Sequence, residues 1–484
     1  MLLALSTKLG ITDQDGTLLT NSLDAATQTA ILAKITAAVD SGTETDTVAK
    51  LQALVLSALP THNPTVPEIL AGKGGFVVNG ASTGEYSGGS VSNAGDVNGD
   101  GFADFIIGAT GAQNTAGISY VVFGKAGTTA VNLNAGSGFS IIGEAAGDNS
   151  GVSVSAAGDV NGDGLADLLI GANQSITYPS STGPGKAYVV YGKADTTAVR
   201  LDQVATGVGG FVMKGEANND GAGISVSSAG DVNGDGLNDL LVGANNANGY
   251  SGKTYVVFGK TDNTEIDLGS VAAGMGGFAL NGVTVHGQNG YSVSGAGDVN
   301  GDGLADLLVG LDDGWGDVED HYSYVVFGKS DTKAVDLYQL ELGKGGFAIN
   351  EVYYASGSGH SVSSAGDVNG DGLDDVIVGA SNWSYSFVVF GKRTTGLVEL
   401  ASINNGGAGG YAIKGALGYE GNGWSVSSAG DVNGDGLADL IVGGIQYNGY
   451  DGASYVVYGK TDIAAIDLTK VAQGIGGFRI TGVP

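Results

Sequence analysis

A nine-residue acidic string, D-x-N-x-D-G-x-x-D, is the part of this sequence with the clearest chemistry. It places side-chain oxygens at positions 1, 3, 5 and 9, and its glycine at position 6 permits a sharp turn. Calcium takes six to eight oxygen ligands, including carboxylates and carbonyls, in a flexible geometry. The string offers no nitrogen or sulfur ligand, which disfavours zinc and copper. It therefore predicts a calcium loop in which position 7 adds its backbone carbonyl and position 9 closes the shell.

The string occurs six times, with steps of 63, 72, 67, 69 and 64 residues between copies, so about six calcium ions are expected. The predicted ligands are Asp96, Asn98, Asp100, Phe102 and Asp104; Asp159, Asn161, Asp163, Leu165 and Asp167; Asp231, Asn233, Asp235, Leu237 and Asp239; Asp298, Asn300, Asp302, Leu304 and Asp306; Asp367, Asn369, Asp371, Leu373 and Asp375; and Asp431, Asn433, Asp435, Leu437 and Asp439. Position 12 is apolar in every copy, so these are not EF-hands, which need Glu there. The alternative is that Asp and Asn only form turns. Three carboxylates in each of six loops favour the metal, because like charges at short range need a counter-ion.

The composition excludes several classes of protein. The chain carries a net charge of −30, and the predicted ligand positions of the six strings hold 18 of its 50 acidic residues. Such a chain repels phosphate backbones, so nucleic acid is not an expected partner. There are no cysteines and only four histidines, which removes disulfides, thiol catalysis and Cys-ligated metals. No apolar run reaches 18 residues, so no membrane span is expected.

Each string lies within a cassette of four strand-like segments. They are an outer segment such as GGFVVNG, an SVS-x-AGD segment that runs into the string, an apolar segment such as LLVGA, and YVVFGK. Runs rich in Val, Ile, Tyr and Phe, bounded by Gly, Asn and Asp, indicate strands. Four strands in 63–72 residues predict the blades of an all-β propeller with six cassettes. Rungs of a β-solenoid, the alternative, are shorter.

The number of blades leaves two alternatives. The outer segment occurs a seventh time, at Gly476–Gly482, whereas the other three segments occur six times. Six blades, with the ring closed by pairing of the two chain ends, is the preferred interpretation. A seventh blade beyond Pro484 is the other.

The chain divides near residue 72. Residues 1–72 are predicted to form a small helical segment and linker, with helical spacing in Leu23–Val39 and Thr47–Leu59 and prolines at 60, 64 and 67. We expect this segment to be a spacer or capping element. Residues 73–484 are predicted to form the propeller. The N-terminus has no basic stretch or cleavage site typical of a signal peptide.

The cassette resembles the FG-GAP repeat of the integrin alpha-subunit propeller and of bacterial surface and secreted proteins. The resemblance is carried by the SVS and LLVGA segments with the acidic string between them, and extends from about Gly74 to Pro484. It implies calcium at the positions named above, on one face of a propeller. Integrin alpha chains have disulfides, usually seven cassettes, and calcium loops in only some of them. This chain has no cysteine, six cassettes, a loop in each and no RGD string, so it is more similar to the bacterial proteins.

A protein or glycan ligand is expected on the loops opposite the calcium loops, since aromatic side chains on loops provide contact area. The candidates are Tyr86, Tyr178, Tyr250, Trp315, His321, Tyr322, Tyr353, Tyr354, Trp383, Tyr385, Tyr419, Tyr447 and Tyr450. No phosphate-binding loop or nucleophile motif is present, and we expect no catalytic residues. A hydrolase that uses two free carboxylates is the alternative, and its candidate residues are Asp312, Asp313, Asp317, Glu319 and Asp320.

Three functions therefore compete. The preferred one is a secreted or cell-surface calcium-binding module for adhesion, because calcium at 10⁻⁴–10⁻³ M, the affinity range of extracellular modules, is found outside cells. The alternatives are a structural component of an envelope or surface assembly, and a propeller-type polysaccharide lyase or hydrolase. Oligomeric state is not predicted.

Overall fold

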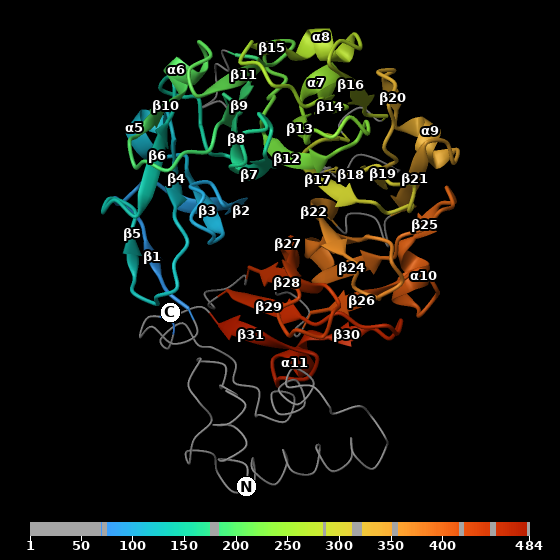
Figure 1. Cartoon of the computed structure of the whole chain (residues 1–484). Coiled ribbons are helices and arrows are strands. Elements are labelled where there is room, and N and C mark those ends of the chain that lie inside the picture. The colour runs from blue at the N-terminus through green and yellow to red at the C-terminus, as the bar shows by residue number, and fades with distance from the viewer. Residues whose placement is uncertain are drawn as a thin grey trace, which may run out of the picture.

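The structure is a computed structural model that describes residue 69 and residues 75–174, 183–283, 287–311, 322–350, 357–415, 421–445 and 452–481. The described residues form an all-β propeller of six blades arranged around a centre (Figure 1). The predicted helical segment at residues 1–72 lies outside the described residues, apart from Ile69. Among the described residues, no helix has the length and apolarity needed to cross a membrane.

Each blade is an antiparallel sheet of four strands that follow one another from the innermost to the outermost. Blades one to three consist of β2 (Ser87–Gly95), β3 (Asp104–Ala109), β4 (Ile118–Val122) and β6 (Gly138–Ile142); β7 (Val154–Gly158), β8 (Asp167–Ala172), β9 (Lys186–Val190) and β11 (Gly210–Lys214); and β12 (Ser225–Gly230), β13 (Asp239–Ala244), β14 (Lys253–Val257) and β16 (Gly277–Asn281). Blades four to six consist of β17 (Ser292–Gly297), β18 (Asp306–Gly310), β19 (Tyr322–Val326) and β21 (Gly346–Asn350); β22 (Ser358–Gly366), β23 (Asp375–Ala380), β24 (Tyr385–Val389) and β26 (Gly410–Lys414); and β27 (Asn422–Gly430), β28 (Asp439–Gly444), β29 (Ala453–Val457) and β31 (Gly477–Thr481).

Short strands connect neighbouring blades at the outer rim. The outer strand of each of blades one to five pairs in parallel with a two-residue strand from the next blade. The two-residue strands are β1 (Val78–Asn79), β5 (Val131–Asn132), β10 (Val199–Arg200), β15 (Ile266–Asp267), β20 (Val335–Asp336), β25 (Val398–Glu399) and β30 (Ile466–Asp467). The short helices are α5 (Ala112–Thr115), α6 (Leu201–Val204), α7 (Ala247–Tyr250), α8 (Leu268–Ala272), α9 (Tyr338–Glu341), α10 (Leu400–Asn404), α11 (Leu468–Val471) and the 3₁₀ turn η1 (Ser381–Trp383).

The second strand of a blade is buried on both of its faces. In β8, Leu168, Leu169 and Ile170 are fully buried, so side chains on both faces of the strand are covered. A strand covered on both faces is apolar throughout rather than alternating. Stacked blades provide that cover, because the five large apolar clusters each join residues of two consecutive blades. The predicted propeller fold is confirmed.

The structure corrects two details of the predicted arrangement. The outer segment opens each cassette in the sequence, but in the fold it is the fourth strand of the preceding blade, as β6 is for blade one. The expected closure of the ring by pairing of the chain ends is also wrong for the described strands. β31 pairs with β29, whereas β1 pairs with β5.

Candidate metal-binding loops and ligand-binding face

The six acidic strings form six equivalent loops, each joining the innermost strand of a blade to its second strand. In blade one, β2 ends at Gly95 and β3 begins at Asp104, and the pairing register of the two strands shifts just before the loop. The loops therefore all lie at the same end of the innermost strands. The fold thus brings together the residues predicted for each loop.

Position 1 organises the turn through its carboxylate. Oδ1 of Asp96 accepts hydrogen bonds from the backbone N–H groups of Gly99 at 2.8 Å and Asp100 at 3.1 Å, and Oδ2 accepts one from Gly101 at 2.8 Å. Gly101 has φ of +89°, which only glycine adopts without strain. The other five loops repeat these contacts. The sequence pattern thus has a backbone role as well as a predicted ligand role.

Positions 3 and 5 lie against each other inside the loop. Nδ2 of Asn98 donates to Oδ2 of Asp100 at 3.0 Å, and Oδ1 of Asp100 accepts from the N–H of Phe102 at 2.9 Å. Asp100 is exposed and Asn98 is half-buried. Carboxylates retain lone pairs after one or two such bonds, so these oxygens can accept a further partner.

Position 9 is buried and joins the loop to a distant strand. Asp306 is fully buried, and its two oxygens accept from the N–H of Val299 at 2.9 Å and of Gly328 at 2.8 Å. Gly328 follows the third strand, in the FGK segment of the cassette. A Cβ on this glycine would meet the carbonyl oxygen of Ala305 at 2.6 Å, so the close approach requires glycine. We call this pair of hydrogen bonds to Asp306 the clamp. Sequence reasoning missed the clamp, although the repeated glycine of FGK was a signal for it.

Burial raises the pKa of these position-9 carboxyls. The pKa reaches about 7 at Asp306 and Asp375 and about 6 at Asp167 and Asp239. Loss of solvation is the largest cause, and the nearby aspartates of the same loop raise the pKa further, while backbone hydrogen bonds lower it. The raised pKa indicates that a positive charge beside these carboxyls would be favourable.

The loops fit a hard cation in the kind of atom they offer. All the side-chain atoms offered as metal ligands are oxygens on one short turn, and the side chains of positions 3 and 5 are hydrogen-bonded to each other. Within the described residues, however, no three His, Asp or Glu side chains converge closely enough to form a ready cation cage. Their oxygens face the loop's own N–H groups instead.

An aromatic row lies at the opposite end of the innermost strands. The residue just before SVS is Tyr291 in blade four, His360 in blade five and Trp424 in blade six. The ring centroids of Tyr291 and His360 are 5.1 Å apart, and those of His360 and Trp424 are 4.5 Å apart. Trp424 is 41 % exposed. The row crosses three blades, so its members come together only in the folded ring.

Sequence reasoning missed this row, because its three residues are about 65 residues apart and different in type. The signal was the single variable position that precedes an otherwise repeated SVS segment. The equivalent residues in blades one to three are Gly89, Val152 and Ile224. One side of the ring's centre is therefore aromatic at this position, and the other is small or aliphatic.

The predicted loop aromatics fall into two groups. Tyr86, Tyr250 and Trp383 are exposed, at 76 %, 51 % and 48 %, while Tyr322 and Tyr385 are half-buried. Tyr178, Trp315, His321, Tyr353, Tyr354, Tyr419, Tyr447 and Tyr450 lie outside the described residues, as does the acidic cluster at positions 312–320. In blade one the two loops at this end are joined, since the N–H of Gly111 donates to the carbonyl of Glu85.

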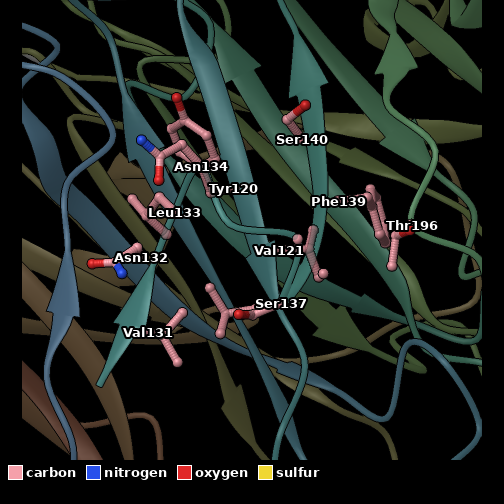
Figure 2. Close-up of a pocket in the computed structure, with 13 residues that line it drawn as sticks. Tyr120, Val121, Val131, Asn132, Leu133, Asn134, Ser137, Phe139, Ser140 and Thr196 are labelled. Carbon is pink, nitrogen blue, oxygen red and sulfur yellow. The ribbon is translucent and has the colours of Figure 1, made fainter. Parts of the chain in front are cut away.

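A hollow of about 240 Å³ lies on the outer part of blade one, between β4, β6 and the segment around β5 (Figure 2). The other five blades have a short helix over the corresponding two strands, as α8 lies over β14 and β16. Blade one has only the turn that contains Leu133 and Asn134. Small-molecule sites usually measure about 300–1,000 Å³. We therefore attribute the hollow to the shorter connection.

Comparison with known proteins identifies the cassette. The FG-GAP repeat matches residues 87–122, 150–190, 222–257, 358–398 and 422–457, which are parts of blades one, two, three, five and six. Similar proteins include integrin alpha pat-2 of Caenorhabditis elegans, 30 % identical over 233 residues, which are 45 % of this chain and 17 % of that protein. Integrin alpha-V of Gallus gallus is 30 % identical over 226 residues, 46 % of this chain and 20 % of the relative. Integrin alpha-PS5 of Drosophila melanogaster is 33 % identical over 177 residues, 35 % of this chain and 16 % of the relative.

The chain thus spans a fifth or less of the length of these relatives. Repeats matched in five blades, together with the six-bladed ring, agree with the resemblance seen in the sequence. The chain contains FG-GAP repeats within a six-bladed β-propeller and is similar to integrin alpha subunits.

Proposed function

We propose that this chain is an extracellular, calcium-stabilised propeller that binds a protein ligand for adhesion through the face opposite its acidic loops. The observation that carries the proposal is the aromatic row of Tyr291, His360 and Trp424, placed at one end of strands whose other end holds the acidic loops. Similarity to integrin alpha subunits supports a binding role. A glycan ligand is the alternative occupant of the same face.

The calcium part of the proposal depends on charge and donor type. Each loop would hold one ion through the oxygens of positions 1, 3 and 5, the carbonyl of position 7 and the carboxylate of position 9. In blade four these are Asp298, Asn300, Asp302, Leu304 and Asp306. The raised pKa of Asp306, caused by burial and by Asp302 and Asp298, supports the need for a cation. Binding at 10⁻⁴–10⁻³ M would suit an extracellular protein.

The number of bound ions tests the calcium part. Equilibrium dialysis at 5 mM calcium, followed by elemental analysis, is expected to give about six ions per chain. The double substitution Asp298→Ala with Asp302→Ala is expected to remove one ion, because both lost carboxylates belong to one loop. Asp202→Ala is the matched control, since Asp202 is an exposed partner of Arg200 outside the loops. An ion count near zero would overturn this part of the proposal.

The ligand part is tested by screening immobilised extracellular matrix proteins and a glycan array. Trp424→Ala and Tyr291→Ala are expected to weaken binding at least tenfold, since truncation of a central aromatic anchor commonly costs 2 kcal/mol or more. Tyr338→Ala is the control, because Tyr338 is equally exposed, at 45 %, but lies in α9 near the outer strand of blade four. Retained binding by the aromatic-row variants would contradict the assigned face. Binding to glycans alone would replace the protein ligand.

The other two functions make different predictions. A structural component would assemble with itself, so its mass in solution would rise with concentration. A lyase or hydrolase would turn over a polysaccharide, and substitution of a loop carboxylate would abolish that turnover. No observation in the described residues favours either over a binding module.

A further inference from the structure

Four of the five contacts between consecutive blades bury a pair of polar side chains. One member of each pair is the second residue of a blade's third strand, and the other stands directly before a glycine at the start of the next blade. The pairs are Ser119 with Ser150, Thr254 with Asn289, Ser323 with Ser358, and Ser386 with Asn422. All eight residues are at most 6 % exposed. Buried polar groups need hydrogen-bond partners, because burial without one costs free energy.

The backbones of the two blades bring the members of a pair together. Between blades three and four, the N–H of Asn289 donates to the carbonyl of Ser251 at 3.1 Å, and Gly252 forms a parallel bridge with Asn289. Thr254 is two residues further along that strand, and Gly290 directly follows Asn289. A Cβ added to Gly290 would lie 2.7 Å from Oγ1 of Thr254, so the hydroxyl faces the next blade.

The same approach recurs at the other three polar contacts. Oγ of the third-strand serine would lie 2.7–2.9 Å from a Cβ added to the glycine of the next blade, at Gly151, Gly359 and Gly423. A glycine at this position therefore lets the backbone of one blade pass directly over a hydroxyl of its neighbour. The side chain before that glycine completes the pair.

Most oxygens of these pairs have no hydrogen-bond partner in the part of the chain that the structure describes. They are Oγ of Ser119, Ser150, Ser323 and Ser386, Oγ1 of Thr254 and Oδ1 of Asn289. A hydroxyl can both donate and accept, so two such oxygens within reach of each other would bond directly. Ser119 and Ser150 do not, and neither do Thr254 and Asn289. Their arrangement calls for a third group that bonds both members.

The contact between blades two and three shows that the two positions change together. Here the residues are Ala187 and Ala222, both fully buried and without a polar side-chain atom. The backbone around them is the same, since the N–H of Ala222 donates to the carbonyl of Pro184 at 3.0 Å and Ala222 forms a parallel bridge with Gly185. Both positions are polar at four contacts and both are apolar at the fifth, so the two polar side chains serve each other.

We propose that each polar pair binds one buried water molecule, which bridges the two side chains and joins neighbouring blades. A buried water makes about three hydrogen bonds to polar groups that otherwise have none, whereas apolar sites stay dry. The alanine pair between blades two and three would accordingly hold no water. At the contact between blades three and four the bridge would also fix the segment that leads into the aromatic row, because Tyr291 follows Gly290. This inference is independent of the proposed ligand and of calcium.

A crystal structure at a resolution that shows ordered water is the direct test. Density for one water is expected within hydrogen-bond distance of Oγ1 of Thr254 and Oδ1 of Asn289, and for another between Ser119 and Ser150. The contact at Ala187 is the internal control and is expected to show no water. A direct hydrogen bond between the members of both pairs, or no density between them, would overturn the proposal.

Substitutions test the same sites in solution through the direction of the change in melting temperature. Thr254→Val keeps nearly the same shape and is expected to lower the melting temperature, because the water loses a partner. Ser119→Ala and Ser150→Ala are expected to do the same, and together to cost less than the sum of the two, since both act on one water. Ala187→Ser is the reverse control and is expected to lower the melting temperature, because Ala222 offers no polar atom to complete a bridge.

The opposite direction would contradict the proposal. A hydroxyl that is buried with no partner of any kind destabilises the fold, so its removal would stabilise the protein. A melting temperature that stays the same or rises in both Thr254→Val and Ser119→Ala would therefore show that no water is held at these pairs.

Discussion

Asp306 and its five equivalents show how one residue type can serve two purposes in the same loop. Position 9 was predicted as a calcium ligand from its charge and spacing alone. In the structure its oxygens also hold two backbone N–H groups, one in the loop and one beyond the third strand. The pattern of Asp, Asn and Gly was sufficient to predict the loop. The clamp could not be predicted, because its second partner is 22 residues away in sequence.

Substituting position 9 should therefore destabilise the fold even without calcium. In buffer with a chelator, Asp306→Ala is expected to lower the free energy of unfolding by about 2–4 kcal/mol, because buried N–H donors lose their acceptors. Asp302→Ala, at the solvent-facing position 5, is expected to cost less than about 1 kcal/mol. Urea unfolding followed by circular dichroism measures both. Equal midpoints for Asp306→Ala and the wild type would show that the clamp is not needed.

A half-buried carboxylate lies far from the loops. Glu144 accepts hydrogen bonds from Nζ of Lys186 at 2.7 Å and from the hydroxyl of Tyr188 at 2.5 Å. Loss of solvation is the largest cause and raises its pKa, but these two hydrogen bonds and the charges of Lys186 and Lys214 together lower the pKa below its ordinary value of 4.5. A carboxylate with a lowered pKa stabilises the fold above its unfolded pKa, and this contribution is lost as the pH falls through the folded pKa.

The stability of the Glu144→Gln variant should accordingly depend on pH. At pH 7 the variant is expected to be about 1 kcal/mol less stable than the wild type, since it loses a charged partner of Lys186. The difference should shrink as the pH falls from about 5 to 3, because the wild-type carboxylate becomes protonated. Thermal melts across this range measure it. Glu399→Gln, at an exposed position on the rim, is the control. A difference that stays constant with pH would contradict the assignment.

At the scale of elements, the contacts between neighbouring blades depend on glycine residues. The strands and their order within each cassette were predicted from runs of β-branched and aromatic residues. The assignment of the outer segment to the preceding blade was not predicted, because hydrophobic patterns do not reveal which sheet a strand joins. The glycine of LLVGA admits the backbone of the neighbouring blade, as Gly243 does for Gly290.

One pair of glycine substitutions tests this contact between neighbouring blades. Gly243→Ala is expected to destabilise the protein by about 3 kcal/mol, because its Cβ would lie 2.1 Å from the carbonyl oxygen of Gly290, a backbone atom that cannot move aside. Gly443→Ala is the matched control in blade six, where the nearest atom is 3.5 Å away. Chemical denaturation of the two variants is the measurement. Similar losses in both would show that the effect is local to the strand and not due to the neighbouring blade.

At the scale of the whole molecule, electrostatic repulsion acts on the ring. Eighteen of the 50 acidic residues are at the predicted ligand positions of the six loops, at one end of the innermost strands, and the net charge is −30. Composition predicted the excess of acid and its concentration in the strings. It could not predict that the loops share one end of the molecule, because that follows from the stacking of the blades. Repulsion between loops adds to repulsion within each loop, and both oppose folding when no cation is bound.

Because of this repulsion, we expect calcium and salt to act on the same quantity, the free energy of unfolding. With a chelator present, raising sodium chloride from 0.02 to 0.5 M is expected to raise the melting temperature, because the Debye length falls from about 20 Å to about 4 Å. At 5 mM calcium the melting temperature should be higher throughout and depend less on salt, since bound ions neutralise the loops and stabilise the folded state by linkage. The triple substitution Asp163→Asn, Asp235→Asn and Asp302→Asn should reduce the salt dependence in chelator, because it removes one charge from each of three loops. An equal salt dependence with and without calcium would mean that the charges of the loops are not what the ion neutralises.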